Sequence, residues 1–232
     1  MPSAAEVSII PVMPGDGFIK IDESDLPEII PILALRNAAL FPGAVFPITI
    51  GRDKSIKLIQ EAEKDNFFIG AVPQIDVMVE DPQDEDLCRF GSVCRILKTL
   101  DMPDGTITAI LQAYRRLEIE TVVGYEPYIT ARVHYREDVL KVSEKNTDVK
   151  ALSESLKEKA IHLLKASNMG TRETVGAIKA IDNFQFLVNF IATTIEVEDF
   201  DRKTDLLQYP CFGQGMDPGS FDPVFKSAIF KA

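Results

Sequence analysis

The spacing of the apolar residues changes once along this chain, and the change constrains the fold more than any other feature. Apolar and polar residues alternate with a period of two in the segment 107–135, with a break at 124–127. This alternation is typical of strands in a sheet that has one covered face. From residue 149 onward the period is helical. The sequence therefore predicts an α+β protein with two lobes, the first rich in strands and the second helical.

The first lobe is expected to span residues 29–137 as a partly closed antiparallel β structure with one inserted helix. Short apolar runs bounded by turn residues predict strands at 32–35, 45–50, 67–72, 88–100, 106–117, 117–123 and 129–135. Asp53 is expected to cap the helix, whose apolar stripe runs to about Asn66. The dipeptide Asp104-Gly105 favours a hairpin turn between the two longest strands.

The second lobe, residues 149–209, is expected to be a bundle of three or four helices. Residues 138–148 are highly charged and lack aromatic side chains, so we interpret them as the linker between the lobes. The first helix is expected to end at Asn168-Met169-Gly170, and a second to open near Thr171. Asp182 is expected to cap a further helix. The apolar stripe of that helix is Phe184, Leu187, Val188 and Ile191.

Both ends of the chain differ from the two lobes in composition. Residues 1–28 mix Pro, Gly, Asp and Glu and are expected to form a flexible leader, in which Phe18–Ile21 is suited to dock on a sheet edge. Residues 210–232 are punctuated by Gly and Pro, which cannot continue a helix. We expect this irregular tail to be non-native or altered sequence, a hypothesis that the sequence of the parent gene would test.

Two groups of motifs follow one another along the first lobe. The first group is Leu33-Ala34-Leu35-Arg36, Leu40-Phe41-Pro42-Gly43 and Phe46-Pro47-Ile48-Thr49-Ile50-Gly51. The second group is Gly91-Ser92-Val93, the turn Pro103-Asp104-Gly105-Thr106 and the strand Ile107–Leu111. In this order they resemble the N-terminal substrate-recognition domain of ATP-dependent Lon proteases. The resemblance covers residues 29–207, which is most of the chain.

The resemblance implies a function through the parts that the family is known to have. A Lon protease is a hexameric AAA+ hydrolase that uses ATP and Mg²⁺ and cleaves proteins with a Ser-Lys pair, as a serine protease. The resemblance implies that this segment selects unfolded, damaged or degron-bearing proteins and supports ring assembly, in protein quality control. The alternative is a stand-alone Lon-domain adaptor or scaffold without protease activity.

Motifs for catalysis, cofactors or metals are missing from the sequence. It contains no Gly-x-x-x-x-Gly-Lys-Ser/Thr phosphate loop and no Gly-x-Ser-x-Gly elbow. Its two histidines, His134 and His162, are too few for a histidine-based triad or a multi-histidine zinc site. We therefore expect a segment without catalytic residues, cofactor or metal. A hydrolase based on the carboxylates of Glu118 and Glu120 is the enzymatic alternative.

Two further groups of residues receive structural interpretations. The acidic residues from Asp76 to Asp86 lack the spacing and the central glycine of an EF-hand loop, which favours a solvated loop over a calcium site. The cysteines Cys88, Cys94 and Cys211 are odd in number and lack a metal-binding spacing, which favours reduced thiols.

The charge of the chain limits its partners. The formal charge is −11, from 25 basic and 36 acidic residues. Such a chain repels the phosphates of nucleic acids and of anionic membranes, so neither is an expected partner. The apolar run 183–195 is shorter than the roughly 20 residues that a membrane span needs, and no secretory signal opens the chain. These features predict a cytoplasmic protein.

Proteins remain as the expected partners, and one region is the candidate binding surface. Its members are apolar side chains beside a turn and charged side chains at the start of a helix: Phe41, Pro42, Phe46, Arg52, Asp53, Lys54 and Lys57. If exposed, the apolar members form a patch that binds unfolded segments, which are themselves rich in apolar residues. The alternative is that Phe41 and Phe46 belong to the core.

Overall fold

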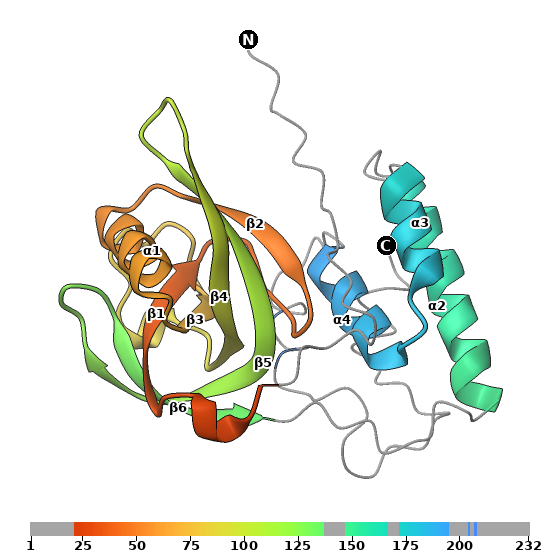
Figure 1. Ribbon diagram of the computed structural model, residues 1–232, viewed down its shortest axis with the longest axis horizontal. Coiled ribbons are helices and arrows are strands. Elements are labelled where there is room, and N and C mark those ends of the chain that lie inside the picture. Colours follow the sequence, from red (N-terminus) through yellow and green to blue (C-terminus); the bar gives the residue numbers. More distant parts are fainter. Residues whose placement is uncertain (1–20, 137–146, 167–171, 195–203, 205–206, 208–232) are drawn as a thin grey trace.

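The fold places a barrel of strands beside a helical lobe (Figure 1). The computed structural model describes residues 21–136, 147–166, 172–194, 204 and 207. One sheet contains β1 (Ile29–Leu35), β2 (Val45–Ile50), β3 (Ile69–Pro73), β4 (Phe90–Asp101), β5 (Ile107–Gly124) and β6 (Thr130–Arg136). The strand order is β2-β5-β4-β3-β1-β6, and an additional pairing between β5 and β6 closes the barrel, with β2 added outside the closed ring.

The sheet is mixed, whereas the sequence analysis predicts an antiparallel one. β1 lies parallel to β3, with Ile32 beside Gly70, and the other named pairs among the described strands are antiparallel. β2 and helix α1 (Asp53–Asp65) lie between β1 and β3 in the sequence. They give the chain the length for the crossover that parallel neighbours require. The α+β class itself is confirmed by these elements.

β5 is one long strand, although the sequence analysis divides it at residue 117. Its first part pairs with β2 and β4, and its last part pairs with β6. The register of the β5–β6 ladder shifts between Ile119 and Thr121. A bulge of this kind bends a strand and increases its twist, so a single continuous strand can serve two parts of a closed sheet.

Helix α1 covers the barrel with the apolar stripe that its sequence predicts. The buried members of this stripe are Leu58, Ile59 and Ala62. The helix ends at Asn66, whose φ of 52° is the left-handed conformation common at helix C-termini. Its N-cap is Arg52, so the prediction of Asp53 as the cap is wrong by one residue. Asp53 is the first helical residue, where the helix dipole stabilises a carboxylate.

The closeness of β3 and β4 requires a glycine in the barrel. A Cβ atom added to Gly91 would lie 2.5 Å from the carbonyl oxygen of Ala71 and 2.8 Å from Cγ2 of Val72. The oxygen belongs to the backbone of the neighbouring strand and cannot rotate away. Glycine therefore lets β4 pass this close to β3.

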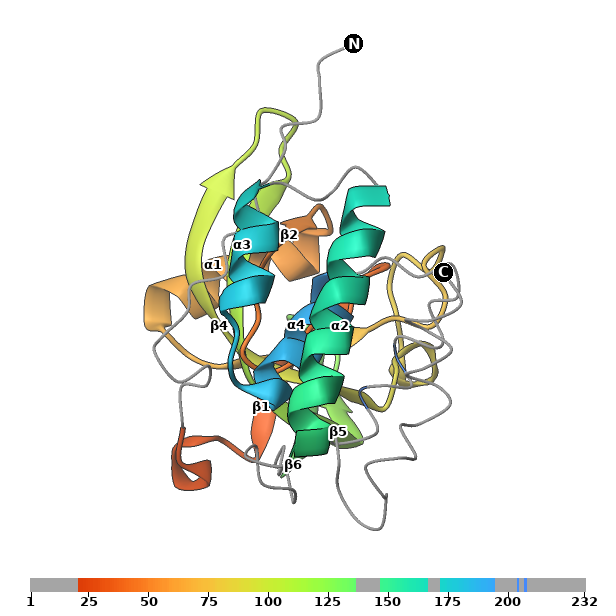
Figure 2. The same ribbon diagram turned by 90° about the vertical axis from the view of Figure 1, so that its right-hand side faces the viewer.

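The helical lobe contains α2 (Thr147–Ala166), α3 (Arg172–Ala180) and α4 (Phe184–Thr194) within the described residues. Figures 1 and 2 show α4 between the barrel and the other two helices. The predicted apolar stripe of α4 is buried. Its cap is Asn183 rather than the predicted Asp182, because Oδ1 of Asn183 accepts a hydrogen bond of 2.8 Å from the backbone N–H of Phe186.

A buried polar cluster joins the two lobes. Arg116 of β5 is 1 % exposed and donates to Oδ1 of Asn189 at 3.1 Å and to the carbonyl of Leu207 at 2.9 Å. The side chain of Asn189 donates in turn to the carbonyl of Pro42 at 3.1 Å. The guanidinium carbon of Arg116 lies 5.4 Å from the ring centroid of Phe41, within the range of a cation–π contact. These contacts fix α4 against the barrel.

Several predicted segments fall on residues that the structure does not describe. They are residues 1–20 of the leader, most of the linker, the helix stop at 168–170 and the tail 210–232. Residues 21–28 belong to the predicted flexible leader, and two of their side chains contact the barrel. Ile21 and Leu26 contact a core cluster, and the carbonyl of Pro27 accepts a hydrogen bond of 2.6 Å from the hydroxyl of Tyr135.

Candidate functional site

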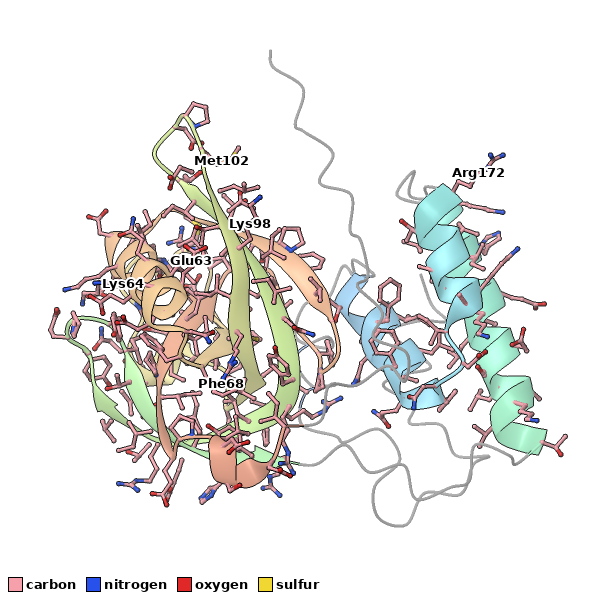
Figure 3. All side chains as sticks on the ribbon, in the orientation of Figure 1. Glu63, Lys64, Phe68, Lys98, Met102 and Arg172 are labelled. Carbon is pink, nitrogen blue, oxygen red and sulfur yellow. The ribbon has the colours of Figure 1, made fainter. Side chains whose placement is uncertain are left out.

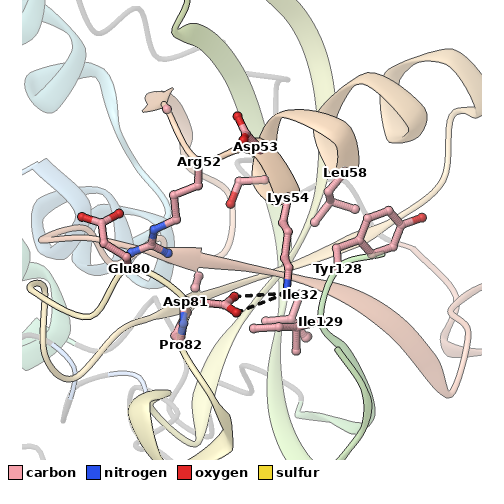
Figure 4. A pocket seen from close by; sticks show the side chains of 13 residues that line it. Ile32, Arg52, Asp53, Lys54, Leu58, Glu80, Asp81, Pro82, Tyr128 and Ile129 are labelled. Carbon is pink, nitrogen blue, oxygen red and sulfur yellow. Dashed lines mark hydrogen bonds and ion pairs between the residues drawn. The ribbon is translucent and has the colours of Figure 1, made fainter. Parts of the chain in front are cut away.

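The barrel carries an open pocket at the N-terminal end of α1, which we call the α1 pocket (Figure 4). Its volume is about 380 Å³, and its walls are the start of α1, the loop after β3 and the residues before β6. Ile32, Leu58 and Ile129 supply an apolar floor, because they are only 3 %, 0 % and 7 % exposed. The charged residues of the rim are Arg52, Asp53, Lys54, Glu80 and Asp81.

A buried amide holds one wall of the pocket in place. Gln74 follows β3, is fully buried, and accepts a hydrogen bond from the guanidinium of Arg52. Its amide nitrogen donates to the carbonyl of Val79 at 2.8 Å and to the carbonyl of Asp76. Asp76 then accepts a hydrogen bond of 2.9 Å from the backbone N–H of Met78. The loop 75–82 is therefore tied to the barrel and to the start of α1, which preforms the pocket.

Ion pairs engage Lys54, Glu80 and Asp81 of the rim. Lys54 contacts Asp81 at 3.2 Å and Glu126 at 2.9 Å, and Arg36 outside the pocket pairs with Glu80 at 2.8 Å. Hydrogen bonds to Glu126 and Asp81 raise the pKa of Lys54. The amine of Lys54 therefore stays protonated, which is the opposite of what a catalytic nucleophile or base requires.

The structure separates the predicted binding surface into two groups. Arg52, Asp53 and Lys54 line the α1 pocket, whereas Lys57 is exposed on α1 outside the pocket lining. The other members, Phe41, Pro42 and Phe46, lie elsewhere.

The apolar members of the predicted surface are buried or half-buried, so a partner could reach little of their surface. Phe41 is 1 % exposed within the core of the helical lobe, and its backbone N–H donates to Oγ1 of Thr193 at 3.3 Å. Pro42 is also buried, and Phe46 is half-buried against the barrel core. The idea of an exposed Phe41 is therefore wrong, and the alternative of a core residue holds for it. The packed helices that cover Phe41 lie far away in the sequence.

Most of the exposed large apolar side chains of the described residues lie in two regions that the sequence analysis does not single out. Ile75 and Met78, which are 59 % and 80 % exposed, belong to the loop that forms a wall of the α1 pocket. Leu97, Leu100 and Met102 are 40–48 % exposed on the β4–β5 hairpin, which projects from the barrel (Figure 3). The register of this hairpin shifts between Ile96 and Lys98. Such a bulge changes which side chains face outward, so simple alternation does not reveal them.

Glu118 and Glu120, the two carboxylates of the alternative hydrolase reading, contact different partners. Glu118 is 9 % exposed and accepts hydrogen bonds from Arg89 at 2.8 Å and from Arg136. Burial would raise the pKa of Glu118, but the hydrogen bonds to the two arginines outweigh burial and lower it. Glu120 lies 3.4 Å from His134 on the exposed surface. A carboxylate held ionised by two arginines is a poor general acid, so this pair does not form a catalytic site.

The described residues also show the environment of two cysteines, the placement of possible metal ligands and the character of the helices. Cys94 is buried, and burial raises the pKa of its thiol. Cys88 is half-buried, and Cys211 lies outside the described ranges. No group of three or more His, Cys, Asp or Glu residues in the described part of the chain is arranged to hold a metal ion. Among the described helices, none combines the length and apolar character needed to cross a bilayer.

Comparisons with known proteins identify the family. The family model of the ATP-dependent protease La (LON) substrate-binding domain matches residues 29–210. Lon protease of Flavobacterium johnsoniae is 41% identical over 193 residues, which are 83% of this chain and 24% of that protein. Lon protease of Cytophaga hutchinsonii is 37% identical over 197 residues, which are 85% of this chain and 24% of that protein. The chain thus spans about a quarter of the length of these relatives.

Solved structures show the same fold at low sequence identity. The N-terminal domain of Mycobacterium avium complex Lon protease superposes with a TM-score of 0.62 at 17% identity, covering 87% of this chain and 96% of that one. A Lon N-terminal domain protein from Xanthomonas campestris gives a TM-score of 0.54 at 16% identity, covering 82% and 92%. The matched range, the identity to the relatives and the shared fold agree, and the chain belongs to the family of substrate-binding domains of the ATP-dependent protease La, or Lon.

Proposed function

We propose that this domain binds unfolded, damaged or degron-bearing proteins for a Lon protease and supports assembly of its ring. Membership of the family supports substrate binding in general terms. The more specific proposal rests on the exposed apolar side chains Ile75, Met78, Leu97, Leu100 and Met102. Folded proteins bury most of their large apolar side chains, so a surface with such groups favours unfolded segments over folded ones.

The energetics of such contacts favour weak binding at each domain. Burial of three apolar side chains of a substrate contributes roughly 4–9 kcal/mol, at about 1.5–3 kcal/mol for each side chain. Association costs at least about 4 kcal/mol, which leaves an affinity in the region of millimolar or weaker. Several domains around one ring would raise the effective concentration of the substrate without tight binding at any one of them. Weak binding also allows a motor to pull the substrate away.

The ATPase and protease parts belong to the proposal for the parent protein. We propose a hexameric AAA+ serine protease of the cytoplasm, with ATP, Mg²⁺ and the Ser-Lys pair in the part that this chain does not span. The seven predicted surface residues enter this proposal only through Arg52, Asp53 and Lys54, which line the α1 pocket. A stand-alone adaptor would use the same surface, and the reading frame beyond residue 208 distinguishes the two, because a phosphate loop must follow in a protease.

Binding to two forms of one protein tests the proposal. Fluorescence anisotropy would compare a labelled disulfide-containing protein in its native form and in a permanently unfolded form, reduced and blocked with iodoacetamide. We expect the unfolded form to bind and the native form not to bind. The double substitution Met78→Ser with Leu100→Ser should weaken binding several-fold, whereas Ile29→Ser, an exposed apolar control on β1, should leave it unchanged. Equal binding of both forms would contradict the proposal.

A further inference from the structure

We propose that the α1 pocket selects extended segments in which one bulky apolar side chain is flanked by lysine or arginine. This inference rests on the proposed function and specifies the class of substrate. Three features of the pocket carry it: a preformed apolar floor, exposed apolar side chains on the adjoining loop, and a rim with more carboxylates than cations.

The size of the pocket fits a single side chain with its peptide unit. Its volume of about 380 Å³ lies at the lower end of the range of about 300–1,000 Å³ for sites that enclose small ligands. A folded surface could not enter such a space, but a side chain from an extended segment can. The floor of Ile32, Leu58 and Ile129 is already shielded from water, so the apolar contribution comes from burial of the entering side chain itself.

The loop that forms one wall of the pocket also carries exposed apolar side chains outside the lining. Met78 and Ile75 lie on the loop 75–82 and are the two most exposed large apolar side chains of the described residues. The hydrogen bonds of Gln74 to the carbonyls of Val79 and Asp76 hold this loop in position. A segment anchored in the pocket can therefore place further apolar atoms against a wall that is already ordered, which lowers the entropic cost of binding.

The charges of the rim favour a basic segment. Three carboxylates, those of Asp53, Glu80 and Asp81, line the pocket with two cations. Arg36 and Glu126, just outside the lining, pair with Glu80 and Lys54, so the carboxylates still outnumber the cations by one. The side chains of Glu80 and Asp81 are 79 % and 63 % exposed, so a ligand can reach them. The loop 75–82 contains no lysine or arginine. Electrostatic complementarity of this kind attracts basic segments and repels acidic ones.

An anionic ligand is a poorer fit to the same site. The guanidinium of Arg52 already donates to Gln74 and to the carbonyl of Val79. The amine of Lys54 already contacts Asp81 and Glu126. A carboxylate or phosphate would have to displace these contacts and would also be repelled by the exposed carboxylates of Glu80 and Asp81. A lysine or arginine would exchange with Arg36 or Lys54 at the same carboxylates, without that repulsion.

Four capped peptides in a Gly/Ser host sequence test the inference on the chain of residues 1–232. Each of three peptides has a central phenylalanine, flanked on both sides by lysine, by glutamine or by glutamate; the fourth has the lysines but alanine in place of phenylalanine. Affinities would be measured by NMR titration in low salt. We expect affinity in the order lysine, glutamine, glutamate, with steps of about two- to fivefold, the usual range for exposed charge pairs. The alanine peptide should bind about tenfold more weakly than its phenylalanine counterpart.

Two sets of variants locate the effect at the pocket. Glu80→Gln with Asp81→Asn should reduce the preference for lysine over glutamate. Glu85→Gln should reduce it much less, because Glu85 is an exposed acid of the short 3-10 helix Asp84–Asp86, outside the pocket lining. Ser55→Trp should fill the pocket and weaken all three phenylalanine peptides. Gln60→Trp, an exposed position on the same helix outside the lining, is its matched control. If tryptophan at position 55 impairs folding, the charge variants still test whether the lysine preference arises at the pocket.

The results separate this inference from the function on which it rests. Unfolded protein that binds while the peptides show no charge preference, or while the pocket variants behave like their controls, would overturn the inference and leave the proposed function intact. Absence of binding to unfolded protein would overturn both. A lysine preference that is lost in Glu80→Gln with Asp81→Asn, that weakens in high salt and that needs phenylalanine would support the inference.

Discussion

Replacement of Arg116 tests whether the buried polar cluster holds the two lobes together. Arg116→Ala removes two charge-assisted hydrogen bonds, to Oδ1 of Asn189 and to the carbonyl of Leu207, and the cation–π contact with Phe41. Each such hydrogen bond contributes about 1.5–3 kcal/mol. Since contributions within one network do not add fully, we expect the free energy of unfolding to fall by about 3–5 kcal/mol. Arg116→Lys should lose a smaller part, because lysine keeps the charge but not the planar fork.

Urea unfolding monitored by circular dichroism measures this loss as a lower midpoint concentration of urea, with an unchanged dependence of the free energy on urea. Arg132→Ala is the matched control, because Arg132 lies on β6 and is 42 % exposed in a single pair with Glu28. Its removal should cost no more than about 1 kcal/mol. A double-mutant cycle of Arg116→Met with Asn189→Leu should show the pair less destabilised than the sum of the single variants. A loss below about 1 kcal/mol for Arg116→Ala would refute the reasoning.

Three further predictions concern single residues. Glu118→Gln should destabilise the protein by about 1–3 kcal/mol near neutral pH, because Arg89 and Arg136 lower the pKa of the folded carboxyl from its ordinary 4.5. This contribution is fully present above pH 4.5 and is lost as pH falls through the lower folded-state pKa, so urea midpoints of the two proteins should converge in acid. Gly91→Ala should cost about 1–3 kcal/mol in urea unfolding, because its Cβ meets the β3 backbone. Asn183→Ala should lower the thermal midpoint through a loss of about 0.5–2 kcal/mol at the cap of α4.

Each of these predictions has a contrary result. If the difference in the free energy of unfolding between wild type and Glu118→Gln stays the same at low pH, the stabilisation by Glu118 does not depend on its ionisation. If Gly91→Ala leaves the free energy of unfolding unchanged, β3 and β4 can move apart. If Asn183→Ala leaves the thermal midpoint unchanged, the side chain of Asn183 does not stabilise α4 as a cap.

Local signals in the sequence predict much of the barrel. The turn at Asp104-Gly105 forms as predicted, and Gly105 has the positive φ, 86°, that glycine tolerates. The stripe of α1 faces the core, and the helix stops at Asn66. The sequence predicts the cap residues less precisely. In Arg52-Asp53 and in Asp182-Asn183 either neighbour could occupy the cap position, and the backbone geometry determines which one does.

Long-range packing explains what sequence reasoning missed. The parallel pairing of β1 with β3 depends on where the chain crosses the barrel, which alternation does not encode. Phe41 sits beside a turn, a typical place for exposed residues, yet α4 covers it. Of the predicted surface, the charged residues at the start of α1 reach a pocket because Gln74 brings the loop 75–82 over them. The side chain of Gln74 gives no signal in the sequence alone.

Mapping the contact surface of an unfolded protein tests the central claim most directly. Amide chemical shifts of the isotope-labelled chain would be followed by NMR during titration with a permanently unfolded protein. We expect the changes to gather on residues 52–55 and 78–82 of the α1 pocket, with a second group on 97–102 of the β4–β5 hairpin. Changes confined to α2 and α3, or no changes at concentrations that saturate binding in anisotropy, would contradict the account.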